Sequence, residues 1–392
     1  MYAIQCKEVL TITNGVIKNG TILVDEGKIK AVGENIEIPG DAEIIRTDHE
    51  TVMPGFVEAH CHIGIMEEKV GWAGADINER SEVATPQARV IDAIKANADE
   101  FGLECALVSG VTTAQILPGS SNVIGGTGSI IKTAPKKTID EMLLVETSGM
   151  KVAFGENPMR CFGIDKSSMP LTRMGVAAVL REWLQKTRNY LEKQKRFEKE
   201  PDKQPEFDSK LEALIPVLNR EIPMRVHAHR ADDAVTAHRI CREFDIDMTW
   251  EHATEGHRLC DWLVENNLPT VWGPGFVHLA KWEMREMSFK TPGILHKAGV
   301  QMAIQTDAPG RDISFLPLSA GLAVKYGLPY QAGLEAITIS PARILGIDDR
   351  VGSIEPGKDA DLIFVSGDPL EISSHVNRVM INGQTEYLRE KE

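Results

Sequence analysis

Two histidines at the end of one apolar stretch, His60 and His62, give this sequence its strongest chemical signal. Residues 52–62 read as a short apolar strand that is entered through the bend Pro54-Gly55 and ends in the two histidines. Residues two apart on a strand point to the same face, so both imidazoles should project together from the strand's carboxyl end. Two imidazoles held side by side on a rigid element form the beginning of a divalent metal site.

Three further residues strengthen that prediction, because each follows a predicted strand. His227 ends the strand at 224–227, His252 ends the strand at 247–252, and Asp307 ends the strand at 301–307. A single histidine in such a place is usually an ordinary buried or surface residue. Their joint position at successive strand ends predicts one metal centre. Zinc is the default metal for a hydrolytic site of this kind, although manganese, iron or cobalt fits the same ligands.

The elements that position these residues alternate between strand and helix. We expect helices at 85–100, 171–198 and 231–243, and buried strands at 110–117, 129–133 and 149–155 besides those named above. The strand at 129–133 follows a Gly- and Ser-rich loop, 118–128, and is the least well marked. Candidate ligands that end strand after strand are typical of the catalytic face of a (β/α)8 TIM barrel.

The two ends of the chain have a different texture. Residues 1–52 are rich in β-branched residues and in Asn-Gly turns, which favour hairpins. Residues 350–392 return to the same character. The sequence therefore predicts an α/β protein in which a barrel, 53–349, is inserted into a small β-sandwich domain formed from both chain ends, 1–52 plus 350–392.

Composition limits the partners and the location. The 392 residues have a net charge of -14, which argues against nucleic acid or an anionic membrane as a partner. No stretch approaches the ~18 apolar residues that span a bilayer, and the N-terminal residues lack a signal-peptide pattern. Six scattered cysteines predict reduced thiols and a cytoplasmic protein. A small-molecule substrate is expected, while the choice between a monomer and a homo-oligomer stays open.

The chain resembles the amidohydrolase superfamily at these motifs. The resemblance is carried by residues 53–62, 226–229, 251–252 and 306–307, and by 352–362, which is similar to that superfamily's C-terminal β-domain signature. The imidazolonepropionase-like and metal-dependent dipeptidase branches look nearest. The resemblance implies one or two metals per chain, the more buried one held by His60, His62 and Asp307 and a second one by His227 and His252.

Related enzymes often bridge two metals with a strand-four residue, either a carbamylated lysine or a glutamate. This chain offers Lys151 and Glu156. They have opposite parity along the strand, so both cannot face inward without a bulge. Lys151 is favoured, because facing it outward would place an unpaired ammonium against the helix layer. A bulge or loop at 155–158 would favour Glu156, and a single-metal site would need neither.

The reaction class that follows is hydrolysis of a C–N bond in an amide, a peptide or a cyclic amide. A divalent metal can bring the pKa of bound water from ~15.7 to about 7. Asp307 would accept the proton of that water and then give it to the leaving nitrogen. His229 shares a face with His227 and would either polarise the substrate carbonyl or support a ligand. Arg160, Arg230 and Arg311 follow strand ends and could clamp a substrate carboxylate, or be solvated or structural arginines.

Other activities use the same residues. A deaminase or an imidazolone-type ring hydrolase would need one metal, and a lactonase would attack an ester instead. A non-catalytic scaffold of the same fold would be expected to have lost a ligand, and the intact set argues against it. Residues 67–85, which include Trp72, form a long polar segment that is expected to act as a substrate lid.

Overall fold

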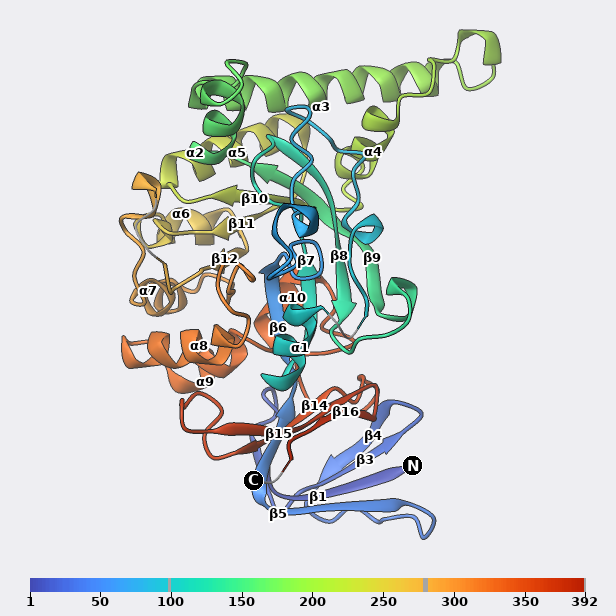
Figure 1. Ribbon diagram of the computed structural model, residues 1–392, viewed down its shortest axis with the longest axis vertical. Coiled ribbons are helices and arrows are strands. Elements are labelled where there is room, and N and C mark those ends of the chain that lie inside the picture. The colour runs from blue at the N-terminus through green and yellow to red at the C-terminus, as the bar shows by residue number, and fades with distance from the viewer. Residues whose placement is uncertain (98–99, 278–280, 391–392) are drawn as a thin grey trace.

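The barrel predicted for the middle of the chain is present in the structure, a computed structural model that describes residues 1–97, 100–277 and 281–390 (Figure 1). Its eight strands follow one another around the sheet in chain order, and the last lies beside the first, so that the barrel is nearly closed. The strands are β6 (Phe56–Cys61), β7 (Val111–Ile116), β8 (Ile124–Lys132), β9 (Leu143–Ala153), β10 (Met224–Ala228), β11 (Met248–His252), β12 (Thr270–Trp272) and β13 (Met302–Ile304).

One strand of the barrel runs against the others. β8 pairs antiparallel with both β7 and β9, whereas the remaining neighbours are parallel. It also begins earlier than the expected strand at 129–133, so that part of the predicted loop 118–128 is strand. The glycines in this stretch had suggested a loop, but Gly126 has φ +117°, and a Cβ there would lie 2.3 Å from the Ala88 carbonyl oxygen. Residues 85–89 can therefore lie this close to β8 only because residue 126 is a glycine.

That approach also explains a helix that does not form. Residues 85–100 were expected to be helical, but their described part holds only a short 3-10 turn, Val90–Asp92. The Thr85 backbone amide donates a hydrogen bond to the Ile124 carbonyl, and the Thr127 amide donates one to the Ala88 carbonyl, at 2.9 Å each. Pairing of this segment along β8 has replaced its local helical preference.

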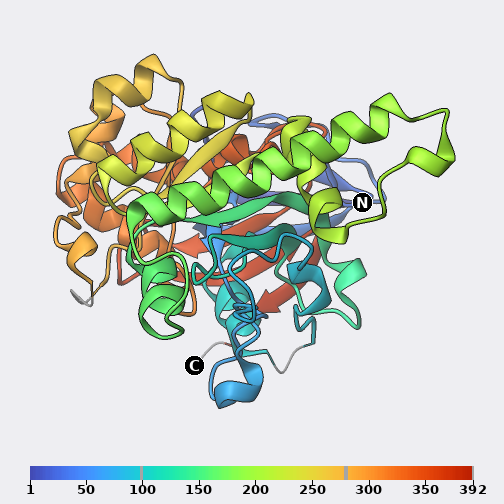
Figure 2. The same ribbon diagram turned by 90° about the horizontal axis from the view of Figure 1, so that it is seen from above.

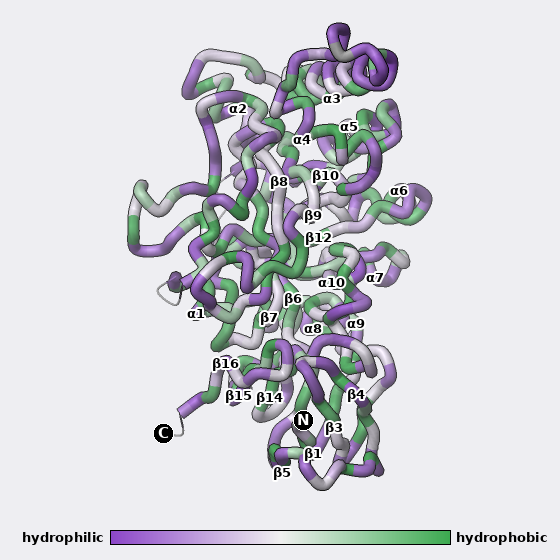
Figure 3. Tube along the Cα trace, turned by 90° about the vertical axis from the view of Figure 1, so that its right-hand side faces the viewer, coloured by the Kyte–Doolittle hydropathy of each residue, from purple (hydrophilic) through white to green (hydrophobic). Residues whose placement is uncertain are grey.

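Helices cover the outside of the barrel (Figure 2). The longest, α3, agrees with the predicted helix 171–198; the Thr172 side chain caps it by accepting from the Gly175 amide at 3.1 Å. The helices are α1 (Phe101–Val108), α2 (Glu156–Met159), α3 (Arg173–Arg196), α4 (Ser209–Leu218), α5 (Ala231–Phe244), α6 (Cys260–Glu265), α7 (Thr291–Ala298), α8 (Phe315–Lys325), α9 (Tyr330–Glu335) and α10 (Ile339–Leu345). The charged end of α3 and the loop beyond it are hydrophilic, as expected for a solvated segment (Figure 3). No helix in the described ranges combines the length and the apolar character needed to cross a membrane.

The two chain ends share a second eight-stranded sheet. Within it, β5 pairs parallel with β1 and antiparallel with β14, which joins the N-terminal strands to the C-terminal ones. The strands are β1 (Tyr2–Leu10), β2 (Val16–Lys18), β3 (Thr21–Asp25), β4 (Lys28–Gly33), β5 (Glu43–Pro54), β14 (Leu362–Ser366), β15 (His375–Ile381) and β16 (Gln384–Leu388). Only Gly55 separates β5 from β6.

A buried cluster of charges fastens this sheet to the barrel. Lys132, on β8, forms ion pairs with Asp361 and, at 3.0 Å, with Asp359. Asp359 also pairs with Arg350 at 2.9 Å and with Lys28 at 2.5 Å. Because all these carboxylates have cationic partners, the cost of burying charge between the two sheets is offset.

Candidate functional site

The carboxyl ends of the barrel strands bring the predicted metal ligands together. Six of these side chains form two groups of three, and within each group the potential metal-binding atoms lie within 4.8 Å of one another. The ring centroids of His60 and His252 are 4.9 Å apart, so the two groups adjoin. The first group is His60, His62 and Asp307, and the second is His227, His229 and His252.

Asp307 faces both histidines of the β6 pair. Its Oδ1 lies 3.2 Å from His62 Nε2 and 3.8 Å from His60 Nε2. Burial alone would raise the pKa of this carboxyl, but the hydrogen bond with His62 and the neighbouring imidazoles hold that pKa well below its usual range. Asp307 has φ +61° and His252 has φ +75°, which is uncommon for residues other than glycine. The backbone therefore adopts a left-handed conformation at two of the residues whose side chains form the site.

Hydrogen bonds fix the orientation of the imidazole rings. Four rings engage their Nδ1 with another group, which leaves Nε2 for the centre of the site. Ligating histidines are usually oriented in this way by a partner on the other ring nitrogen. The four Nδ1 contacts are His60 with Glu251 Oε2 at 2.9 Å, His62 with the Leu117 carbonyl at 2.7 Å, His229 with Thr254 Oγ1 at 2.8 Å and His252 with the Gly273 carbonyl at 2.9 Å.

The protonation state of the histidines suits a metal. Burial lowers the pKa of His60, His227 and His229 well below the ordinary value, and it lowers that of His252 to about 3. Neutral imidazoles offer the lone pair that coordination requires. Neutral imidazole nitrogens around an ionised carboxylate therefore fit one or two divalent transition metals.

Of the two strand-four candidates, the structure brings Lys151 to this centre. Its Nζ lies 2.9 Å from His60 Nε2, while Met150 and Val152 on the other face of β9 pack in the core. Burial lowers the pKa of Lys151 from 10.5 to about 8. Glu156 lies past the end of the strand, where its carboxylate accepts a hydrogen bond from the backbone amide of Glu283 at 3.0 Å.

A cavity of about 380 Å³ opens above the histidines. Its lining includes His62, His227, His229 and Asp307. The predicted lid, residues 67–85, contributes Ile77 and Asn78 to the wall, next to Met66, and the loop after β7 contributes Gly119, Ser120 and Ser121. These two segments are joined by a hydrogen bond from the Ser121 amide to Asn78 Oδ1 at 3.0 Å.

Of the three arginines predicted near the site, one lines this cavity. Arg311 does so, and its guanidinium also donates to the Phe276 carbonyl. Arg160 is exposed on the surface. Arg230 forms an ion pair with Asp232 at 2.7 Å. Neither Arg160 nor Arg230 contributes to the lining.

The cavity holds a cation that sequence reasoning missed, Lys281. Its Nζ lies 3.2 Å from both His229 Nε2 and Asn157 Oδ1, and 3.3 Å from Glu283 Oε1. Lys281 directly precedes the short 3-10 helix Trp282–Met284, between β12 and α7, with no motif around it in the sequence. Only the fold places it opposite His229.

Two buried glutamates support the ligands. Glu251 holds His60, as described above, and Glu58 accepts from the His60 and Thr306 amides at 3.0 Å each. Burial raises the pKa of Glu58 to about 8. Both lie inside strands that are buried throughout, where a glutamate is uncommon, and that position is the signal that could have identified them.

Comparison with known proteins agrees with this arrangement. The pattern that describes the Amidohydrolase family matches residues 51–385. The crystal structure of an amidohydrolase from Thermotoga maritima MSB8 superimposes with a TM-score of 0.95 at 41% identity, over 99% of this chain and 100% of that one. The amidohydrolase tasK from Hapsidospora irregularis is 29% identical over 94% of this chain, although the match spans only 40% of that relative's length. An imidazolonepropionase from Maricaulis maris (strain MCS10) is 24% identical over 94% of this chain and 93% of its own.

Proposed function

This chain belongs to the amidohydrolase family, and we propose that it is a metal-dependent hydrolase of a C–N bond in a small substrate that bears a carboxylate. The main support for the proposal is the set of side chains at the floor of the cavity. Two adjoining groups of metal-binding side chains lie there, with Asp307 between His62 and His60. A divalent metal bound at this floor would supply Lewis acidity and an activated water.

The chain's own residues would move the proton. The low pKa of Asp307 keeps it ionised at neutral pH, so that it can accept a proton from the attacking water. The same carboxyl group would then deliver that proton to the leaving nitrogen. His229 lines the cavity and, when it is not a ligand, would polarise the substrate carbonyl.

The position of Lys281 in the cavity is the reason for expecting a negatively charged substrate. The Lys281 side chain lines the cavity, and its anionic neighbour Glu283, 3.3 Å away, is shared with Arg173 at 3.9 Å, so the positive charges exceed this one carboxylate. Arg311 adds positive charge to the same lining. A carboxylate on the substrate would complete these contacts by charge-assisted hydrogen bonds, each contributing about 1.5–3 kcal/mol.

Cyclic amides are a second candidate class, favoured by the imidazolonepropionase from Maricaulis maris that matches almost the whole chain. Ring opening and peptide hydrolysis need the same water and the same proton transfer. They are expected to differ in the number of metals and therefore in the role of Lys151, which would bridge two metals as a carbamate.

The test begins with the metal content of protein purified without chelator and with bicarbonate present. About two metals per chain would place dipeptides and N-acyl amino acids first in a substrate screen, and about one would place cyclic amides first. Protein that holds no metal and takes up none on titration would refute the hydrolase proposal and leave a scaffold.

The carboxylate preference is tested separately with Lys281→Met. We expect KM to rise at least tenfold for the best carboxylate substrate and to change little for its neutral amide analogue. Lys290→Met, an exposed lysine nine positions along the chain, is the matched control and should leave both constants unchanged. Equal effects of Lys281→Met on the acid and the amide would contradict the assigned role.

A further inference from the structure

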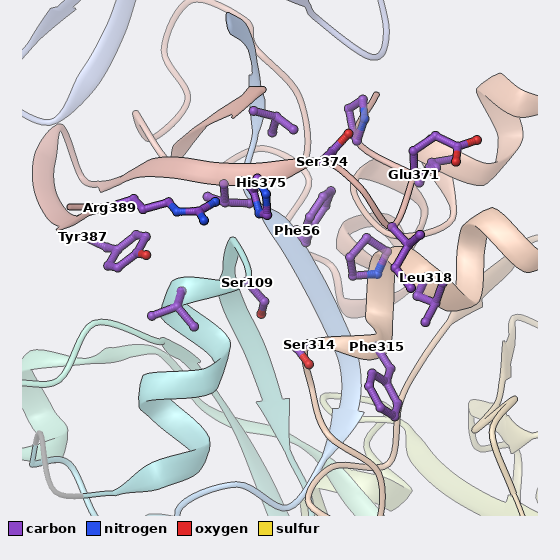
Figure 4. A pocket seen from close by; sticks show the side chains of 17 residues that line it. Phe56, Ser109, Ser314, Phe315, Leu318, Glu371, Ser374, His375, Tyr387 and Arg389 are labelled. Carbon is purple, nitrogen blue, oxygen red and sulfur yellow. The ribbon is translucent and has the colours of Figure 1, made fainter. Parts of the chain in front are cut away.

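A second cavity, of about 460 Å³, lies where the barrel meets the sheet of the chain ends (Figure 4). Phe56, the first residue of β6, lines it, whereas His62, just beyond the other end of that strand, lines the first cavity. The two cavities have no lining residue in common. This second cavity therefore lies away from the metal centre and is not part of the proposed hydrolytic site.

The interior of this cavity is apolar. Phe56 is 1% exposed, Val365 is 2% exposed and Leu370 is 7% exposed, so these walls are part of the packed core and hold their positions. Leu318 and Val376 add partly buried aliphatic surface. A preformed apolar wall of this kind suits the hydrocarbon part of a small molecule, and the volume lies in the usual range for ligand pockets.

One end of the cavity is polar and positively charged. Figure 4 shows Arg389 and Tyr387 on one side, with the guanidinium of Arg389 directed towards His375. Throughout the described ranges, none of these three side chains makes a hydrogen bond or an ion pair with another residue. Glu371, the anionic member of the lining, lies on the opposite side, beyond Phe56. The donors of Arg389, His375 and Tyr387 are therefore available to a ligand.

We propose that this cavity binds a small amphipathic carboxylate. Its carboxylate would receive two parallel N–H donors from Arg389 and further donors from His375 and Tyr387, since a guanidinium matches a carboxylate in two-point geometry. Its aromatic or branched aliphatic body would rest against Phe56 and Val365. Such a ligand would contact the barrel and the chain-end sheet at once, and would stabilise their association.

The proposal is tested with 3-phenylpropanoate and its neutral amide, 3-phenylpropanamide, as probes of the same shape. Binding to the metal-loaded full chain is measured by ligand-observed NMR titration. We expect the acid to bind with a dissociation constant at or below about 1 mM and the amide roughly tenfold more weakly. Arg389→Met should remove that preference, while Arg343→Met, an exposed arginine outside the cavity, should leave it unchanged.

A second variant locates the bound probe. Ser314 lines the cavity, and its hydroxyl makes no hydrogen bond in the described structure, so Ser314→Trp adds bulk without removing a contact. It should weaken binding of both acid and amide at least tenfold. Removal of the metal with a chelator should leave the acid bound, which separates this site from the hydrolytic one. Equal affinities for the acid and the amide, binding unaffected by Ser314→Trp, or binding lost with the metal would each overturn the proposal.

Discussion

The buried amine of Lys151 makes a quantitative prediction about carbamate formation. Only the neutral amine reacts with carbon dioxide, the nitrogen adding to carbon and releasing one proton. An ordinary lysine with a pKa of 10.5 is neutral in about one molecule in 3,000 at pH 7, whereas a pKa of about 8 makes about one in 11 neutral. Burial therefore increases the reactive fraction by a factor of about 300.

This difference is measurable with ¹³C-labelled bicarbonate. We expect a carbamate carbonyl signal in the NMR spectrum of the metal-loaded protein, and we expect that signal to rise with pH, because only the deprotonated Lys151 amine reacts. Lys151→Met should abolish the signal. Lys297→Met, a change at the end of α7 away from the cavity, should not.

Two results would refute this reasoning. One is a metal-loaded protein with no carbamate signal anywhere between pH 7 and pH 9. The other is a signal that persists in Lys151→Met, which would place the reaction at a different amine. In either case the contact between Lys151 and His60, 2.9 Å between nitrogens, would instead be a hydrogen bond that orients the ring.

Two further predictions concern support of the site and of the fold. Glu251→Gln should weaken metal binding about 10- to 100-fold in a chelator competition, because His60 loses the carboxylate that orients its ring. The control Glu265→Gln, at an exposed position, should have no effect. Equal metal affinities of Glu251→Gln and the unchanged protein would contradict the assigned role of Glu251. Burial opposes ionisation of Asp359, but Lys132 and the other cations around it hold its pKa at about 2, below the ~3.9 of an unfolded chain. The ionised Asp359 therefore contributes about 2–3 kcal/mol to the free energy of unfolding above pH 4, and this contribution is lost as the pH falls towards 2. Asp359→Asn should lower the urea midpoint clearly at pH 7 and much less at pH 2.5. A decrease of the midpoint that does not vary with pH would contradict this reasoning.

Residues whose position follows from a short periodic pattern could be predicted from the sequence. His60 and His62 share a face because alternation along β6 is local, and the same reasoning places Lys151 inward on β9. The structure has both where the pattern indicated, since a one-residue slip would have turned the imidazoles and the amine away from the centre of the barrel and into the apolar packing outside it. Glu58 belonged to the same pattern, and a charge within a buried strand could have been interpreted as support for a ligand.

Residues whose position depends on pairing far along the chain could not be predicted in this way. The segment 85–100 has a helical pattern, yet its Thr85 amide donates to β8 and its Ala88 carbonyl accepts from β8, a strand whose path is set by neighbours on both sides. Lys281 is a stronger case, because its side chain meets Asn157 and His229, which lie 124 and 52 positions away along the chain. Substrate preference in this family fold is therefore expected to reside in loops that local sequence patterns describe poorly, while the metal ligands reside on strands that those patterns describe well. For that reason, replacing Lys281 should change which substrates are accepted, whereas replacing Asp307 should remove the reaction for all of them.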